Sequence, residues 1–445
     1  MDYIIAEEEL TAGQRQVQTI REVFHYLHQF KGKCFVIKID CSIIEHPQFP
    51  MFIKDIVRLR DTGIGIVLIP GAKERIDQVL SDYGIVSQWE NNIRITDNNM
   101  IPFVKMAAFD VANRIMTSLA AAGCTAVIGN WVRARGIGVV DGVDYQNTGF
   151  PEKIMTSDVL RIISDGVIPI LPCVGWSSVG KPYNIASDDL AVITASRLGA
   201  DKLFFMTSYG GYNAADYELP AGTVVSTDGK ISNFSLQGIQ QFFRLNKMSP
   251  ELDLLEKAKR ACESGVARVH ILDGCSDGVL LREIFSNLGS GTMVYSNAYS
   301  GIRSMRPDEI GDVLRVMKPF VDKDILLPRT EEMIEACLND YIVFEIDGAI
   351  HASCALHVYP EGVGEIAGIA VDRNYSHLGV GPKLVDYLCE RGRKMGLQKV
   401  FVLTTRTSDW FLSLGFEEGD LASLPEKKRA AYNYSRKSRI FVKNL

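Results

Sequence analysis

The chain has 445 residues, of which 47% are hydrophobic and 23% charged, a composition typical of globular protein and a length that favours two or three domains. Its net charge of −6 includes no long basic run, which excludes nucleic acid as an expected partner. No apolar stretch reaches the roughly 18 residues of a membrane span, and the N-terminus lacks the basic and apolar regions of a secretory signal. We therefore expect a cytoplasmic protein without membrane association.

Residues 1–32 are predicted to form an amphipathic helical arm. Val17, Ile20, Phe24 and Leu27 recur at helical spacing, and Gly32 can end the helix. The apolar face of such an arm needs a partner surface, which predicts a homo-oligomer.

Short apolar runs then alternate with helical patterns over residues 33–292. The runs lack polar alternation, as strands do when helices cover both faces of a parallel sheet. This order of elements predicts a three-layer αβα sandwich. The predicted strands are CFVIKID (34–40), IGIVLIP (64–70), TAVIGN (125–130), VIPILPCVG (167–175), KLFFMTS (202–208) and ARVHILD (267–273).

The pattern changes after a predicted linker at residues 293–300. Residues 301–445 are expected to form a second domain of the α+β class, beginning with helices over 301–337. A hairpin with Asp347-Gly348 as its turn follows, then the strand GEIAGIAVD, a helix and the strand KVFVLTT.

The nine cysteines include no C-x-x-C pair, and the seven histidines form no ligand cluster in the sequence. Most of the cysteines lie in apolar runs. We therefore interpret them as reduced core thiols and predict no metal site.

The segment AGIAVDRNYSHLGVGPKLVDYL carries the strongest functional signal. A strand leads into Gly379-Val380-Gly381, which opens a helix whose apolar face includes Leu384. Glycines let backbone N–H groups approach a ligand, and a helix N-terminus adds free donors, so the turn can bind a diphosphate. A tight turn whose glycines serve packing is an equally good interpretation of the spacing alone. A dinucleotide fold is disfavoured, because Leu384 stands where its third glycine belongs.

This segment resembles motif A of the GNAT acetyltransferases, in which an Arg/Gln-x-x-Gly-x-Gly/Ala turn holds the pyrophosphate of acetyl-CoA. The sequence departs from the motif at its first position, which is Ser376, followed by His377. GEIAGIAV, LTTRTSDWFLSLGF, LPEKKRAAYNYSRKSR and the distant GNWVRARGIGVVDGVDYQNTG further resemble the N-acetylglutamate synthase family. In that family an amino-acid-kinase-like domain precedes the GNAT domain, and the resemblance covers nearly the whole chain.

The resemblance implies transfer of acetyl from acetyl-CoA to the α-amine of L-glutamate, the first step of arginine biosynthesis. Glu365 is the implied general base, and backbone N–H groups from Gly368 to Val371 are implied oxyanion donors. Thr404 is the implied proton donor to the leaving thiolate, although Thr405 is hard to separate from it. The acetyl-CoA contacts would be Ile369, Val371, Ser376, His377, Gly379, Val380 and Gly381. The substrate contacts would be Arg329, Gly368, Arg436 and Ser438.

Each of these roles has a simpler alternative when the family is set aside. Glu365 would be a solvated residue near the end of a strand, and Thr404 would be present because threonine favours β structure. The YSRKSR run would be a basic, solvated tail. Trp410 and Phe411 are interpreted as core residues of their helix.

The first domain is predicted to lack kinase activity. The segments where a working kinase has glycine-rich phosphate loops read Lys38-Ile39-Asp40-Cys41 and Pro70-Gly71-Ala72-Lys73. Asp40 would place negative charge beside a phosphate. Asp188 matches a catalytic position of the kinase family, whereas Ser208 replaces another.

Regulation by L-arginine is what the resemblance implies for this domain instead. The matching residues are Tyr26, His270, Glu283, Gly289 and Gly291. The family also implies a hexamer. Two alternatives stay open: a bifunctional synthase and kinase, and a non-catalytic arginine sensor with a degenerate GNAT domain.

Overall fold

The computed structural model of the chain describes residues 23, 30–226, 228–285, 290–296, 300–346, 349–372, 375 and 379–445. The chain divides into two compact units, one formed by the described residues up to 296 and the other by those from 300 onward. Nearly all of the predicted N-terminal arm lies outside the described residues, as does the predicted hairpin turn Asp347-Gly348. None of the described helices is long and apolar enough to cross a membrane.

A nine-stranded sheet forms the centre of the first unit, in the order β14-β15-β17-β16-β13-β1-β2-β10-β5. Strands β16, β13, β1, β2, β10 and β5 are parallel, as the uninterrupted apolar runs predict. Strand β17 is antiparallel to β16, and β14 to β15, so the sheet is mixed at that end. The strands are β1 (Cys34–Ile39), β2 (Gly65–Pro70), β5 (Ala126–Ile128), β10 (Ile168–Ile170), β13 (Lys202–Thr207), β14 (Val224–Val225), β15 (Ile231–Ser235), β16 (Arg268–Asp273) and β17 (Gly291–Tyr295).

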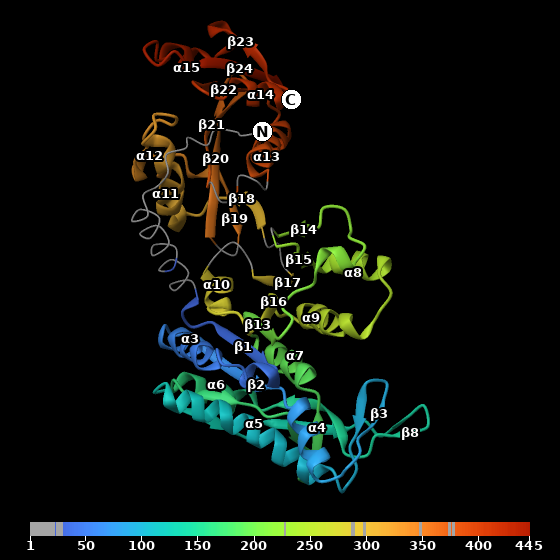
Figure 1. Cartoon of the computed structure of the whole chain (residues 1–445). Helices are drawn as coiled ribbons and strands as arrows, with labels where there is room; N and C mark the ends of the chain where they lie inside the picture. The colour runs from blue at the N-terminus through green and yellow to red at the C-terminus, as the bar shows by residue number, and fades with distance from the viewer. Residues whose placement is uncertain are drawn as a thin grey trace. The chain divides into compact units, whose positions relative to one another are not determined.

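Helices cover both faces of this sheet, which confirms the predicted sandwich (Figure 1). Helices α7, α8 and α9 pack together on one side, while α2, α3, α4, α5 and α10 pack together on the other. Their bounds are α2 (Cys41–Ile44), α3 (Phe49–Asp61), α4 (Lys73–Asp82), α5 (Ile101–Ala121), α6 (Thr156–Ser164), α7 (Ser187–Leu198), α8 (Leu236–Leu245), α9 (Asp253–Glu263) and α10 (Val279–Phe285). One continuous hydrophobic core joins the layers.

A smaller sheet and two hairpins complete the first unit. The predicted strand VIPILPCVG is in fact two strands, because the chain leaves the main sheet after β10 and enters a small four-stranded barrel as β11. The barrel consists of β6 (Val132–Gly136), β9 (Thr148–Ile154), β11 (Val174–Trp176) and β12 (Pro182–Ile185). The hairpins are β3 (Gln88–Glu90) with β4 (Ile93–Ile95), and β7 (Val139–Val140) with β8 (Val143–Asp144).

The second unit is built on a seven-stranded sheet in the order β18-β19-β20-β21-β22-β24-β23. Among the described strands of this sheet, only β21 and β22 are parallel neighbours, and α13 lies between them in the sequence. The strands are β18 (Ser300–Ser304), β19 (Tyr341–Ile346), β20 (Ala349–Tyr359), β21 (Val363–Val371), β22 (Lys399–Thr404), β23 (Glu417–Gly419) and β24 (Arg439–Asn444). The helices are α11 (Ile310–Val321), α12 (Glu331–Glu335), α13 (Val380–Lys394), α14 (Ser408–Ser413) and α15 (Glu426–Ala430).

Helices lie on both faces of this sheet, and each face has its own hydrophobic core. Helix α13 packs on one face through Val380, Leu384 and Leu388, all fully buried. Helix α11 packs on the opposite face through Val313 and Met317 (Figure 1). The predicted hairpin and the two later strands are confirmed as β19, β20, β21 and β22.

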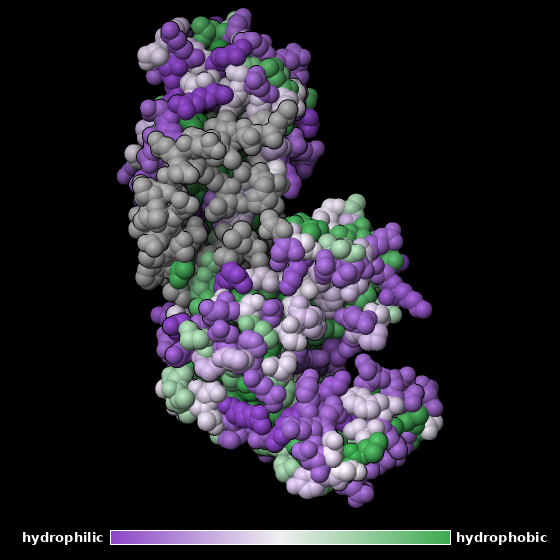
Figure 2. All heavy atoms as spheres, in the orientation of Figure 1, coloured by the Kyte–Doolittle hydropathy of each residue, from purple (hydrophilic) through white to green (hydrophobic). Residues whose placement is uncertain are grey.

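The structure differs from the expectation around the junction of the units. Residues 293–295 of the predicted linker belong to β17, and residue 300 begins β18. Residues 301–337 were expected to be helical, but 300–304 form an edge strand paired with β19. The helix predicted within RTEEMIEACL is confined to α12. On the face shown in Figure 2, hydrophobic residues form small groups separated by hydrophilic ones, as is usual for a globular surface.

Candidate active site

The parallel strands β21 and β22 separate into a fork after Glu365. Their ladder ends with the pair Glu365–Phe401, although β21 continues to Val371 and β22 to Thr404. Beyond that pair the described part of β21 has no ladder partner in β22. Its backbone groups on this edge therefore face the opening of the fork, where they can bind a ligand.

A bulge in β21 lies inside this fork. Ala367 is opposite Ala355 in β20, but Ala370 is opposite Ser353, so β21 holds one extra residue between these pairs. Gly368 occupies the bulge with φ +65°, a conformation that favours glycine. A bulge re-aims the backbone groups around it, and these are the N–H groups predicted as oxyanion donors.

Arg329 covers the bulge. Its guanidinium atoms lie 3.5 Å from where a Cβ on Gly368 would be. The guanidinium also donates a hydrogen bond to the hydroxyl of Tyr341 and lies 5.5 Å from the centre of that ring. Burial raises the pKa of the fully buried Tyr341, which keeps its hydroxyl protonated. The structure thus brings Arg329 and Gly368 together and fixes the plane of the guanidinium.

Glu365 lies at the base of the fork and is only 4% exposed. One carboxylate oxygen is 2.6 Å from the ammonium of Lys428, and the other accepts a hydrogen bond of 2.8 Å from Tyr359. Burial, and then the adjacent carboxylate, raises the pKa of Tyr359, so its hydroxyl stays a donor. Lys428 compensates the charge that Glu365 carries in a buried position. Each oxygen retains a further lone pair that can accept a proton.

Arg436 and Ser438 lie in the segment before β24. The guanidinium of Arg436 donates to the backbone carbonyls of Asp324 (3.1 Å) and Ile325 (2.7 Å). These carbonyls lie in the loop between α11 and α12 that also carries Arg329. The carbonyl of Ser438 accepts a hydrogen bond of 2.5 Å from Tyr432. Arg436 therefore joins the loop that carries Arg329 to the segment that carries Ser438.

Helix α13 begins at the opening of the fork with a glycine turn. Gly379 is its N-cap with φ +64°, and it has no side chain to cap the first turn, so among the described residues the N-cap leaves the first N–H groups available to an anion. A Cβ on Gly381 would lie 3.1 Å from the ring of Trp410. Trp410 thus packs against the glycine turn as well as its own core. Ser376 and His377 lie outside the described residues.

Thr404 ends the other arm of the fork, and Thr405 follows the strand. The Thr404 hydroxyl is half-buried, lies 2.6 Å from the Thr407 hydroxyl and accepts a hydrogen bond from the N–H of Thr407 at 3.1 Å. Thr405 is exposed. A fixed hydroxyl is the better proton donor, which favours Thr404.

Replacing Thr404 by Val is expected to lower kcat by about 10²-fold, the usual contribution of a general acid. Val keeps the shape and β propensity of Thr, so the variant tests the hydroxyl alone. The matched variant Thr405→Val should leave kcat unchanged. A steady-state assay in which only Thr405→Val is slow would assign the role to Thr405.

The first unit has a cluster of charges at the carboxyl ends of its central strands. The buried Lys38 forms ion pairs with Asp40 and, at 2.7 Å, with Asp188. Burial alone would lower the pKa of Lys38, but the two carboxylates outweigh it and the net shift is upward. Lys257 lies 3.8 Å from Asp188. The carboxylate of Asp40, which directly follows β1, is thus already paired with Lys38 near the end of that strand.

His270 and Glu283 form a buried pair in the same unit. Nδ1 of His270 lies 2.7 Å from one oxygen of Glu283, and the other oxygen accepts from the N–H of Ser290 at 2.6 Å. Burial lowers the pKa of His270. The Glu283 carboxyl also has a lowered pKa, because its hydrogen bonds outweigh the cost of burial. The ring of His270 stacks on Phe204 at 4.8 Å. Gly291 begins β17 next to Ser290, whereas Tyr26 and Gly289 lie outside the described residues.

Comparison with known proteins identifies both units. The model of the amino acid kinase family matches residues 33–227, and that of the acetyltransferase (GNAT) family matches residues 308–416. An amino-acid acetyltransferase from Ralstonia nicotianae is 32% identical over 444 residues, covering 97% of this chain and 96% of the relative. The corresponding enzyme of Photorhabdus laumondii is 33% identical, with 96% and 97% covered.

The chain belongs to the amino-acid acetyltransferase family. Among solved structures it is similar to the N-acetylglutamate synthase of Neisseria gonorrhoeae complexed with coenzyme A and L-arginine. The TM-score is 0.82 at 30% identity, and the match covers 96% of this chain and 99% of that one. The same enzyme complexed with coenzyme A and N-acetyl-glutamate matches with a TM-score of 0.60.

The sequence did not predict Lys428 and Tyr359 as partners of Glu365, the candidate base of this amino-acid acetyltransferase. Lys428 lies within the run LPEKKRAAYNYSRKSR, but neighbouring Lys427 and Arg429 look the same in a sequence. Tyr359 could have been found from strand alternation, because it follows His357 by two residues and His357 is opposite Glu365. Residues at that spacing share a face.

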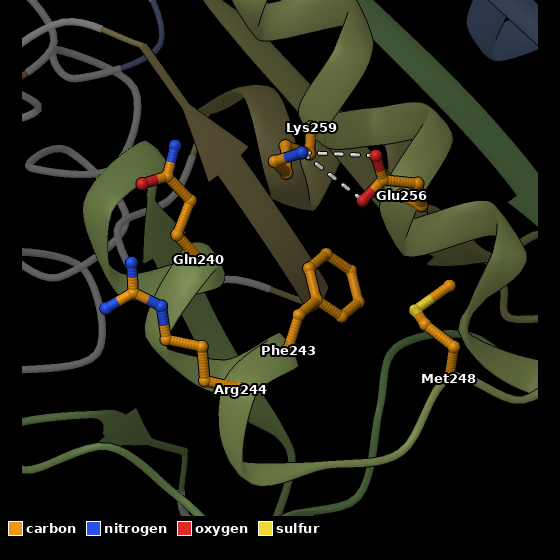
Figure 3. Close-up of a pocket in the computed structure, with 6 residues that line it drawn as sticks. All are labelled: Gln240, Phe243, Arg244, Met248, Glu256 and Lys259. Carbon is orange, nitrogen blue, oxygen red and sulfur yellow. Dashed lines mark hydrogen bonds and ion pairs between the residues drawn. The ribbon is translucent and has the colours of Figure 1, made fainter.

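A separate pocket of about 500 Å³ lies in the first unit beside α8 and α9. Phe243 projects into it, and Lys259 is already paired with Glu256 at 3.1 Å (Figure 3). It includes none of the residues predicted for acetyl transfer, and we assign it no part in that reaction. Its lining residues are Gln240, Phe243, Arg244, Met248, Glu256 and Lys259.

Proposed function

We propose that this amino-acid acetyltransferase transfers the acetyl group of acetyl-CoA to the α-amine of L-glutamate, the first step of arginine biosynthesis. The observation that carries the proposal is the fork between β21 and β22, with buried Glu365 at its base and the glycine turn of α13 at its opening. The similarity to an N-acetylglutamate synthase complexed with coenzyme A supports both substrates.

Acetyl-CoA is proposed to bind with its pyrophosphate at the first turn of α13 and its thioester in the fork. Gly379 leaves room for a phosphate, because a Cβ there would meet no other described atom within 4 Å, whereas Gly381 makes room for the ring of Trp410. The N–H groups of the first turn supply donors. The backbone N–H groups near Gly368, Ile369 and Val371 then surround the thioester carbonyl. Such donors stabilise the oxyanion of the tetrahedral intermediate.

The reaction removes two protons from the nitrogen of glutamate and delivers one to sulfur. Glu365 accepts a proton from the α-ammonium of glutamate, directly or through water, and the free amine attacks the acetyl carbon. The new C–N bond forms and the C–S bond breaks. Thr404 donates its hydroxyl proton to the departing thiolate and takes in return the second proton of the attacking nitrogen, which leaves as a neutral amide. The products are N-acetylglutamate and coenzyme A.

Arg329 and Arg436 are proposed to bind the two carboxylates of glutamate, with Ser438 as a further donor. Arginine binds a carboxylate with two parallel hydrogen bonds, which fixes orientation as well as affinity. The contacts of Arg329 with Tyr341 and of Arg436 with backbone carbonyls hold both guanidinium groups in place before substrate arrives.

The proposal is tested by following free thiol after mixing the protein with acetyl-CoA and each of a panel of amino acids. L-glutamate should give the largest kcat/KM. If no thiol is released at millimolar glutamate, the protein is not an acetyltransferase for glutamate, and the alternative of a non-catalytic arginine sensor is favoured.

L-arginine is proposed to bind the first unit at His270 and Glu283 as a feedback effector. The protein is proposed to be a cytoplasmic homo-oligomer, and the family resemblance implies a hexamer. The buried Glu283 carboxylate can bind a guanidinium. Gly291 directly follows Ser290, whose N–H donates a hydrogen bond to that carboxylate.

Replacing Glu283 by Gln should weaken arginine binding by about 10-fold or more, since a hydrogen bond to a charged group contributes about 1.5–3 kcal/mol. Calorimetry measures the loss, and the exposed Glu90→Gln serves as control. Equal affinity in the two variants would exclude this site.

The first unit is expected to form no ADP from ATP and N-acetylglutamate. Asp40 pairs with Lys38 and would repel a phosphate. Asp40→Gly should therefore bind ATP more tightly than the natural chain in a calorimetric titration. ADP formation by the natural chain would establish the bifunctional alternative.

A further inference from the structure

Three side chains with metal-binding atoms converge in the second unit. They are the thiol of Cys337, the carboxylate of Asp340 and the imidazole of His357, whose ligand atoms all lie within 4.8 Å of one another. Nδ1 of His357 is 2.7 Å from Asp340. All three residues are partly exposed, so an ion can reach them from solvent.

The fold rather than local sequence brings these groups together. Cys337 and Asp340 lie at the ends of one short 3-10 turn, η4 (Leu338–Asp340), and His357 lies on β20, which this turn contacts. Ring packing of Tyr341 against His357, with centroids 6.3 Å apart, helps to hold the imidazole there. The sequence contains no C-x-x-C pair and no cluster of histidines, so the prediction of no metal site overlooked this group.

We propose that Cys337, Asp340 and His357 bind a divalent cation of the zinc type. Thiolate, imidazole and carboxylate are the three side-chain ligands that Zn²⁺ takes in proteins. Three protein ligands with a fourth position open to water is the coordination of an accessible site rather than a closed structural one. Binding of the ion releases the thiol proton of Cys337 to solvent and places the ring proton of His357 on Nε2, which frees Nδ1 and the Asp340 carboxylate to bind the ion.

The position of the ion gives it a consequence for the proposed reaction. His357 is directly opposite Glu365 in the antiparallel pair β20–β21, so the two side chains share one face of the sheet. A dication there attracts the Glu365 carboxylate and repels the ammonium of the incoming amino acid. Zn²⁺ is therefore an inhibitor of acetyl transfer. This consequence rests on the proposed function, whereas binding of the ion does not.

A hydrogen bond from His357 to Asp340 that merely fixes η4 against the sheet is the competing explanation. It gives Cys337 no role, because the thiol hydrogen bond found among the described residues goes to the carbonyl of Met333, at 3.1 Å. Participation of the sulfur therefore separates the two explanations.

The experiment titrates the full-length, chelator-treated protein with Co²⁺ and follows the absorption of a cobalt–thiolate bond. The expected result is one Co²⁺ per chain with sulfur charge-transfer absorption, displaced by Zn²⁺. Cys337→Ser and Asp340→Asn should each weaken Zn²⁺ binding by about 10²-fold, since loss of even an outer partner of a ligand costs 10- to 100-fold. The partly exposed Cys275, in the first unit, provides the matched control Cys275→Ser.

Circular dichroism first establishes that each variant is folded, and either variant of the pair suffices for the test. Absence of thiolate absorption in the natural chain, or its persistence in Cys337→Ser, overturns the site. The same holds if Zn²⁺ binds both variants as tightly as the natural chain. If binding follows the prediction but acetyl transfer fails, the site stands and the proposed reaction does not.

Discussion

Replacing Glu365 by Gln is expected to slow acetyl transfer by about 10²-fold or more, the usual contribution of a general base, and to leave acetyl-CoA binding unchanged. Gln keeps the size of the side chain and can still accept a hydrogen bond from Tyr359. It removes the group that takes the proton from the ammonium. Lys428, with 28% of its side chain exposed, can turn its charge toward water in the variant.

The matched control is Glu417→Gln, at an exposed position of β23. Its turnover should equal that of the natural chain. Calorimetry with coenzyme A separates a binding defect from a chemical one. Unchanged kcat in Glu365→Gln would remove Glu365 from the mechanism, and lost coenzyme A binding would show that the variant disturbs the fork instead.

Replacing Arg329 by Met is expected to raise the KM for glutamate by about 10²-fold, because a bidentate carboxylate contact is worth about 3 kcal/mol or more. Met fills much of the volume of the arginine stem over Gly368. The loss is therefore one of charge and hydrogen bonding rather than of packing. The effect on kcat should be smaller, since Arg329 binds ground state and transition state alike.

Arg393→Met, on the outer face of α13, is the control, because Arg393 is half-exposed and pairs with Glu390 of the same helix at 3.8 Å. It should change neither KM nor kcat. A KM for glutamate in Arg329→Met equal to that of the control would show that Arg329 holds the bulge but does not bind substrate. A melting temperature close to that of the natural chain would exclude unfolding as the cause of a raised KM.

The sequence predicted the architecture because hydrophobic periodicity is local. Uninterrupted apolar runs marked β1, β2, β13 and β16, and the buried positions Val380, Leu384 and Leu388 marked α13. Short edge strands such as β18 carry no such signal. Residues 300–304 are too few to show a period, and pairing with β19 decides their conformation.

The candidate site was predictable only where a motif preserves spacing. The glycine turn and the strand holding Glu365 are neighbours in the sequence, so the resemblance places them. The fork and the bulge at Gly368 depend on register between three strands, which no local pattern encodes. Lys428 reaches Glu365 through a tertiary contact, and no pattern distinguishes it from neighbouring Lys427 and Arg429.

The most direct test of the central claim is to incubate the full-length protein with L-glutamate and acetyl-CoA labelled in its acetyl group. Mass spectrometry then follows the label, and a thiol reagent counts the coenzyme A released. We predict labelled N-acetylglutamate in a one-to-one ratio with free thiol. Thiol release without labelled N-acetylglutamate, or no release at all, would contradict the assignment.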